Sequence, residues 1–266
     1  MKTLFDGTLK SVLDDKKISE TLRQISVAGL SDEEVVIALH DPCDIRKAYS
    51  EKLENQGVVR DLEGKLVSGY NTFNTICVGG DGKQLHLSDM TVYSNGDKAH
   101  YVTQAELDKL VNKQVAGIKA KEEVAFTERE QAILQLLADD DLVNLGRVSR
   151  KQLQAVSSQF KAANPEVAIW HVLDRQFDGA PLFEFITHDL QDKCVIRLKS
   201  SRNSQEKWVN EAGKECPVKL KDVPLAGKQI ERLNKVRLKG KVYQQAKRII
   251  EWGTLVLAGK AMLLCE

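Results

Sequence analysis

The sequence predicts an α/β protein with a mixed β-sheet, followed by a smaller basic segment rich in β-strands. Two short apolar runs, VVIALH at 35–40 and VAIWHVLD at 167–174, have the length and β-branched content of buried strands. Residues with helical periodicity lie between them, and the net charge changes sign along the chain. With 266 residues, the chain is long enough for one sizeable core and an appendage.

The first three strands are predicted to form an antiparallel meander. The run at 35–40 is followed by a predicted turn at Pro42 and a polar connection, then by SGYNTFNTICVGG at 68–80 and KQLHLSDMTVYS at 83–94. The last two runs meet at a Gly-Gly-Asp-Gly turn, and an Asp-Gly pair in such a turn is a strong hairpin signal.

Three helices are predicted from sites with capping-box spacing, each followed by apolar residues at helical intervals. The capping pairs are Thr103 with Glu106, Thr127 with Glu130, and Ser149 with Gln152. The helical region is expected to end at Asn164, because proline follows it and restricts the preceding residue to an extended backbone.

The strand at 167–174 is followed by a predicted helix at 179–190 and a fifth strand, KCVIRLKSS, at 193–201. A meander continued by strand–helix–strand crossovers allows the fourth strand to lie parallel to the first and beside it. Asp41 and Asp174 then follow neighbouring parallel strands at the same edge of the sheet.

Two carboxylates this close together require a group that offsets their electrostatic repulsion. Neighbouring strands lie roughly 4.8 Å apart, and two such charges about 4 Å apart repel by roughly 4 kcal/mol at an effective dielectric constant of about 20. A divalent cation removes the repulsion, and oxygen ligands suit Mg²⁺ or Mn²⁺. The alternative is that each aspartate only begins a turn, as aspartates often do at strand ends.

The formal net charge of +1 hides a strong asymmetry. Residues 1–192 hold 22 Lys and Arg against 31 Asp and Glu, whereas residues 193–250 hold 16 against 5. A segment this basic can neutralise phosphates, so nucleic acid is a candidate partner. A solvated lysine-rich surface is the alternative.

Other classes of protein are disfavoured. The five cysteines lack the spacing of a zinc site or a disulfide framework, and no run has the length of a membrane helix or the form of a signal peptide. We therefore expect a cytoplasmic protein without a membrane partner. His40 and His171 alternate with apolar residues, so they are predicted to be core or edge histidines.

Three stretches carry a resemblance to a known family: HDPCDIRKAYSEKLENQG, LDRQFDGAPLFEFI, and VIRLKSSRN continuing to VKLKD and LKGKVYQQAKRI. They resemble the bacterial insertion-sequence transposases, which carry a DDE catalytic triad on a ribonuclease-H-like fold with a late β-rich insertion. The resemblance spans roughly residues 30 to 260 and implies a mixed sheet with helices on both faces. It also implies double-stranded DNA as partner, a homodimer, and Mg²⁺ or Mn²⁺ as cofactor.

Carried over by position, the resemblance implies that Asp41 and Asp174 are the first two catalytic, metal-binding acids. Asp44 competes for the first role but matches a non-catalytic acid. Arg175 would face DNA or orient a carboxylate, and Asp178 would help to organise the start of the following helix.

The third catalytic acid of the family has no counterpart. Its helix follows a pattern that begins with Tyr, but the positions after Tyr243 that should hold Arg, Glu and Lys hold Ala246, Ile250 and Leu257. The expected organisation is a helical segment at 1–30, a ribonuclease-H-like catalytic core at 31–200 and a basic insertion at 201–266, truncated before the catalytic helix.

The resemblance therefore predicts a transposase for DNA transposition whose cleavage and strand transfer are impaired when this chain acts alone. The alternatives are a catalytically incomplete DNA-binding fragment and a relict product that barely folds. The residues predicted to contact DNA, besides Arg175, are all basic: Lys199, Arg202, Lys219, Lys221, Arg237, Lys239, Lys241 and Arg248.

Overall fold

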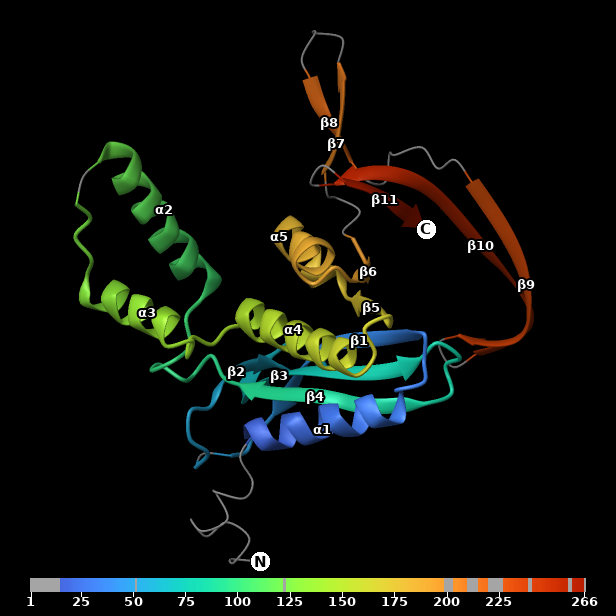
Figure 1. The fold of residues 1–266 in the computed structure, drawn as a ribbon, viewed down its shortest axis with the longest axis horizontal. Helices are drawn as coiled ribbons and strands as arrows, with labels where there is room; N and C mark the ends of the chain where they lie inside the picture. Colours follow the sequence, from blue (N-terminus) through green and yellow to red (C-terminus); the bar gives the residue numbers. More distant parts are fainter. Residues whose placement is uncertain are drawn as a thin grey trace, which may run out of the picture. The chain divides into compact units, whose positions relative to one another are not determined.

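The chain forms two compact units in a computed structural model (Figure 1). The structure describes residues 15–50, 52–121, 123–198, 203–209, 215–219, 227–238, 241–257 and 260–265. Unit 1 comprises Met1–Asp174 with Phe185–Val195, and unit 2 comprises Arg175–Glu184 with Ile196–Glu266.

A mixed sheet forms the centre of unit 1, which confirms the predicted α/β class. Its six strands are β1 (Val35–Arg46), β2 (Gly57–Arg60), β3 (Leu66–Gly79), β4 (Leu85–Tyr93), β5 (Ala168–Leu173) and β6 (Lys193–Ile196). Their order is β2-β3-β1-β5-β6, with β4 also paired to β3. The predicted meander is β1-β3-β4, antiparallel throughout, and β5 lies parallel to β1 as expected. The short strand β2 was not predicted.

The prediction that the first strand turns at Pro42 is wrong. Strand β1 continues through Pro42, which pairs with Phe73, and stays paired with β3 as far as Arg46. Its pairing with β5 stops at His40. Beyond that point β1 has a described neighbour on one side only, so a residue without a backbone N–H is tolerated there.

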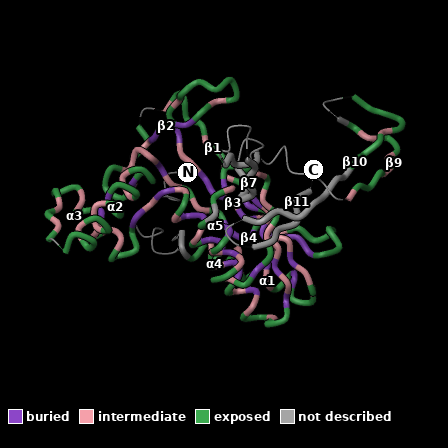
Figure 2. The backbone as a smooth tube through the Cα atoms, turned by 90° about the horizontal axis from the view of Figure 1, so that it is seen from above, coloured by how far each residue is buried: buried purple, intermediate pink, exposed green. Residues whose placement is uncertain are grey.

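Two helices cover one face of this sheet. They are α1 (Asp15–Gly29) and α4 (Leu145–Ala163). Val36 and Ala38 of β1 are fully buried in a cluster that includes Val156 and Phe160 of α4. Figure 2 shows such buried positions gathered along the strands of unit 1. Helices on the opposite face, implied by the family resemblance, stay a prediction.

The opposite face of the sheet is more open. Strand alternation places Leu39, Leu87 and Met90 on it, and these side chains are 37%, 41% and 41% exposed. This face is therefore more exposed than the face that α1 and α4 cover.

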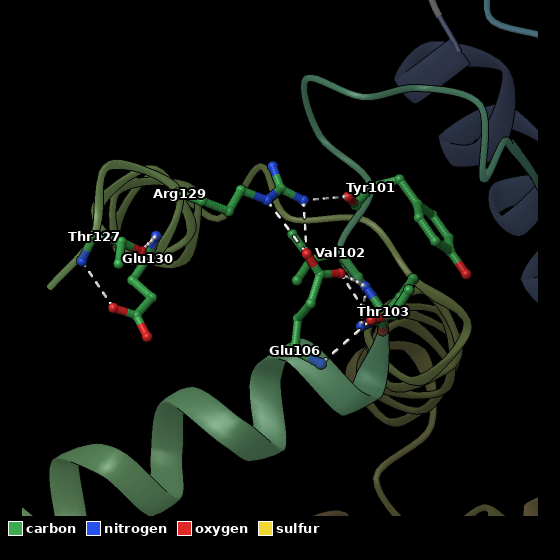
Figure 3. A network of polar contacts seen from close by, with 8 residues as sticks. Tyr101, Val102, Thr103, Glu106, Thr127, Arg129 and Glu130 are labelled. Carbon is green, nitrogen blue, oxygen red and sulfur yellow. Dashed lines mark hydrogen bonds and ion pairs between the residues drawn. The ribbon is translucent and has the colours of Figure 1, made fainter.

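Helices α2 (Gln104–Ala120) and α3 (Glu128–Ala138) form a separate pair around their own apolar cluster. Both predicted capping boxes are present: the Thr103 and Thr127 side chains accept from the backbone N–H three residues later, and the glutamates bond back. Arg129 links the two helix starts by donating to Glu106 and to the Tyr101 carbonyl (Figure 3).

The third predicted cap, at Ser149, is wrong. Helix α4 begins earlier, after Asn144, whose side chain accepts from Arg147 N–H at 2.9 Å and donates to the Val102 carbonyl at 3.0 Å. Ser149 and Gln152 are buried on the core side of the helix. The end of α4 at Ala163, with Asn164 as its C-cap, agrees with the prediction.

The remaining elements follow β5. The predicted helix at 179–190 is divided into α5 (Ala180–Glu184) and a π-helical turn, η3 (Phe185–Asp189), and a short 3₁₀ turn, η2 (Arg175–Phe177), precedes it. The basic segment is rich in strands, as predicted: β7 (Asn203–Val209), β8 (Glu215–Lys219), β9 (Gly227–Leu238), β10 (Lys241–Leu257) and β11 (Lys260–Cys265).

Replacing Thr103 by alanine should lower the free energy of unfolding by about 1 kcal/mol, because the first turn of α2 loses its N-cap. Urea unfolding followed by circular dichroism measures this. The control is Glu106→Gln, which retains an amide for the capping box and loses only the exposed ion pair with Arg129, so its effect should be smaller. The reverse order of the two effects would contradict the capping argument.

Candidate functional site

The paired register of β1 and β5 brings Asp41 and Asp174 to the same end of two neighbouring parallel strands. The last residues paired are His40 and Leu173, and the next residue on each strand is an aspartate. Both aspartates are exposed. Since neighbouring strands are roughly 4.8 Å apart, the two carboxylates can act on one bound group.

Asp41 has close polar neighbours on its own strand and on β3. The Cys43 thiol donates to its Oδ2 at 3.0 Å, and the Asn74 amide donates to its backbone carbonyl at 3.3 Å. The hydrogen bond to Asp41, together with partial burial, raises the pKa of Cys43. The thiol is therefore held protonated as a donor to Asp41.

Asp44 has a structural role. It accepts hydrogen bonds from the backbone N–H of Arg60 at 3.2 Å and from the Asn71 side chain at 2.9 Å, which tie β1 to β2 and β3. Because Asp44 is three residues from Asp41, strand alternation directs it to the other face of the sheet. These contacts favour Asp41 as the functional acid.

Buried polar side chains form a line of contacts from β3 across β1 to β5, close to the strand ends from which the two aspartates continue. His40 Nδ1 lies 2.8 Å from Thr75 Oγ1, His40 Nε2 lies 2.9 Å from His171 Nδ1, and His171 Nε2 lies 3.0 Å from Asp192 Oδ2. We call these four residues the histidine line. With both rings neutral, each contact joins one donor to one acceptor, running from Thr75 to the Asp192 carboxylate.

The carboxylate end of the histidine line is neutralised. Lys161 of α4 forms an ion pair with Asp192 at 2.6 Å, while the Asp192 side chain is only 1% exposed. Burial alone would raise the pKa of Asp192, but hydrogen bonds from His171, Lys161 and Ser157 hold it below its ordinary value. At the other end, burial and the neighbouring His171 lower the pKa of His40 well below its ordinary value.

His40 and His171, predicted to be core or edge histidines, are core residues, since they are 4% and 0% exposed. The hydrogen bonds between them were not predicted. The alternation of each histidine with apolar residues signalled burial, but no local motif connects either ring to Asp192, which lies twenty-one residues beyond His171.

The described residues place no third ligand beside the aspartate pair. Among the described residues, no three His, Cys, Asp or Glu side chains gather in a way that could hold a metal ion. Two carboxylates can still contribute to a Mg²⁺ site, because Mg²⁺ usually keeps several waters and binds through one or two carboxylates and substrate phosphates. Arg175 begins the η2 turn of unit 2 and is exposed, and Asp178 is half-buried before α5.

Only some of the predicted DNA contacts can be placed. Lys199, Arg202, Lys221 and Lys239 lie outside the described residues, and Lys219 ends β8. Arg237, Lys241 and Arg248 lie on the ribbon formed by β9 and β10. Strand alternation puts Arg237 and Arg248 on one face and Lys241 on the other, so they do not form a single surface.

The face of the ribbon that carries Lys241 also carries two basic residues that were not predicted. Arg232 and Lys247 are paired directly across the strands, and both are exposed. No ion pair joins either of them to an acid within the described part of the chain. On the opposite face, Arg248 Nε donates to Glu231 at 2.9 Å. We call the face with Arg232, Lys241 and Lys247 the basic ribbon face.

Comparisons with known proteins add no identification. A scan against known protein families and a search of curated proteins each found no match. No helix among the described residues combines the length and the apolar composition that a membrane crossing needs.

Acidification from pH 7.5 to 5.5 should lower the free energy of unfolding. Unfolded His40 titrates near its ordinary pKa of about 6.5, whereas folded His40 stays neutral to lower pH, so the unfolded state binds more protons in this range. Urea unfolding in the presence of EDTA measures the slope.

The variant His40→Gln should flatten this pH dependence, whereas His188→Gln, which changes an exposed histidine, should keep it. An unchanged slope in His40→Gln would show that other groups cause the effect.

Proposed function

We propose that this chain is a DDE-type transposase that cleaves and transfers DNA strands with Mg²⁺ or Mn²⁺, with Asp41 and Asp174 as its metal-binding acids. The observation that carries the proposal is their common position, one residue beyond the last pair of β1 and β5. Both aspartates are exposed, which favours access of a substrate to the two carboxylates.

The strand order supports a ribonuclease-H-like assignment for unit 1. An antiparallel meander of β1, β3 and β4 is extended on the other side of β1 by the parallel strand β5 and then by β6. The transposases that this chain resembles have this order of strands, and their first two catalytic acids follow the first and fourth strands. A fold hosts many functions, so the proposal depends on the aspartates and not on the fold.

The protein residues supply charge and orientation. A bound magnesium ion would neutralise charge on a phosphodiester and activate water. Asp41 and Asp174 would hold such an ion from neighbouring strands, and the Cys43 thiol orients one oxygen of Asp41. Because no third acid joins the pair within the described residues, we expect weaker cation binding and slower cleavage than a complete triad gives.

The proposal predicts that Asp41→Asn and Asp174→Asn each abolish Mn²⁺ binding, because each removes one of two ligands. Binding is measured by the electron paramagnetic resonance signal of free Mn²⁺, and cleavage by Mn²⁺-dependent nicking of plasmid DNA.

Asp44→Asn is the matched control, since it changes a nearby exposed aspartate whose contacts are structural. It should retain cation binding and nicking. Binding that survives in both Asp41→Asn and Asp174→Asn, or is lost equally in Asp44→Asn, would overturn the proposal.

A second candidate function is DNA binding without cleavage, and the basic ribbon face favours it. Directly opposed like charges weaken a strand pair, yet Arg232 and Lys247 stand opposite one another and exposed. A phosphate bound between them would remove the repulsion. Tyr243 lies on the same face and is 45% exposed, so it is available to a bound nucleic acid.

The double variant Arg232→Ala, Lys247→Ala should weaken binding to a labelled DNA duplex. It should also reduce the slope of log affinity against log salt by about 1.8, since each lost phosphate contact removes about 0.9. Fluorescence anisotropy at several salt concentrations measures both quantities.

Arg248→Ala is the control for this experiment, because Arg248 is already paired with Glu231. It should change the salt slope little. A double variant with the same slope as the unchanged protein would exclude the basic ribbon face as a phosphate contact.

A further inference from the structure

We infer that the hydrogen bond between His40 and His171 positions the Asp41 and Asp174 carboxylates, so the two histidines are positioning residues for the cation site. The inference rests on the proposed function, because it names what sets the spacing of the two proposed ligands. It goes beyond that function because neither histidine touches the cation or the substrate.

The contact between His40 and His171 lies near the end of the paired segment of β1 and β5. His40 is the last residue of β1 that pairs with β5, and it immediately precedes Asp41. His171 stands three residues before Asp174 on β5. Their 2.9 Å contact is therefore a side-chain connection between the two strands at the end from which the two aspartates continue.

Further contacts of both rings hold the His40–His171 contact in place. His171 is bonded at its other nitrogen to Asp192, which is paired with Lys161 of α4. The His40 ring stacks on Phe73 of β3, with ring centroids 5.8 Å apart and an interplanar angle of 5°. Both rings are buried, so neither has water as an alternative partner.

The His40 ring connects β1 to two different strands. The contact from His40 to His171 joins β1 to β5, which carries the second aspartate. The contact from His40 to Thr75 joins β1 to β3, which carries neither aspartate. Only the first contact should control the spacing of the carboxylates.

Two substitutions at one position distinguish these contacts. In His40→Gln, the amide nitrogen or oxygen can reach the place of Nε2 and keep the bond to His171. In His40→Asn, the shorter amide reaches only the place of Nδ1 and keeps the bond to Thr75. Thr75→Val removes the β3 contact from the other side and leaves both histidines in place.

We expect Mn²⁺ affinity in the full chain to fall at least about tenfold in His40→Asn, as when a residue that orients a metal ligand is lost. In His40→Gln and Thr75→Val the affinity should stay within about threefold of the unchanged protein, well inside that limit. Urea unfolding reports stability separately, so a purely structural effect would follow stability across the three variants. Equal losses of affinity in all three, or none in His40→Asn, would overturn the inference.

A second readout does not need the cation. Nitroxide labels attached through Asp41→Cys and Asp174→Cys, in a background in which the five native cysteines are replaced by serine, report their separation by dipolar broadening of the resonance spectrum. The separation should be broadly distributed in His40→Asn and narrow in His40→Gln and Thr75→Val. If the unchanged protein binds no Mn²⁺, the proposed function fails, while the label distances still decide whether the histidines set the spacing.

Discussion

The parallel pairing of β1 with β5 is the constraint on which the candidate site depends. Its register ends with His40 beside Leu173, so Asp41 and Asp174 continue from the same position on neighbouring strands. A slip of one residue in either strand would turn its side chains to the opposite face and separate the carboxylates. The contact between His40 and His171 is specific to the observed register, because any slip would misalign the two ring nitrogens.

A buried polar line is an unusual way to secure such a register, because each polar group loses its hydration. The histidine line avoids most of that cost because its polar groups have hydrogen-bond or ion-pair partners within the protein. Each ring of the two histidines uses both nitrogens, and the Asp192 charge is met by Lys161. Apolar residues could fill the same volume, but they would make no directional bond between the two strands. A chain of directional bonds is satisfied in only one, which is the advantage that a polar network can offer a fold.

The sequence was sufficient for features that are encoded locally or by strand order. The caps at Thr103 and Thr127, the end of α4 and the parallel position of β5 were all predicted. The cap of α4 was misplaced because Ser149 and Gln152 have capping-box spacing. The actual cap, Asn144, is held by a hydrogen bond to the Val102 carbonyl, which is distant in sequence. The histidine line was missed for the same reason: its partners come from separate elements, and no spacing along the chain connects them.

Strand alternation explains why neighbouring residues in this protein have different tasks. His40 faces the helices and is buried, whereas Asp41, the next residue, faces the open side of the sheet. The ribbon of β9 and β10 follows the same rule, with the Glu231–Arg248 ion pair on one face and the Arg232–Lys247 pair on the other. In each case one face satisfies its own charges or polar groups, and the other leaves charge exposed. In water such exposed charges are solvated, and they attract ions of opposite sign, cations at the aspartates and anions at the basic ribbon face.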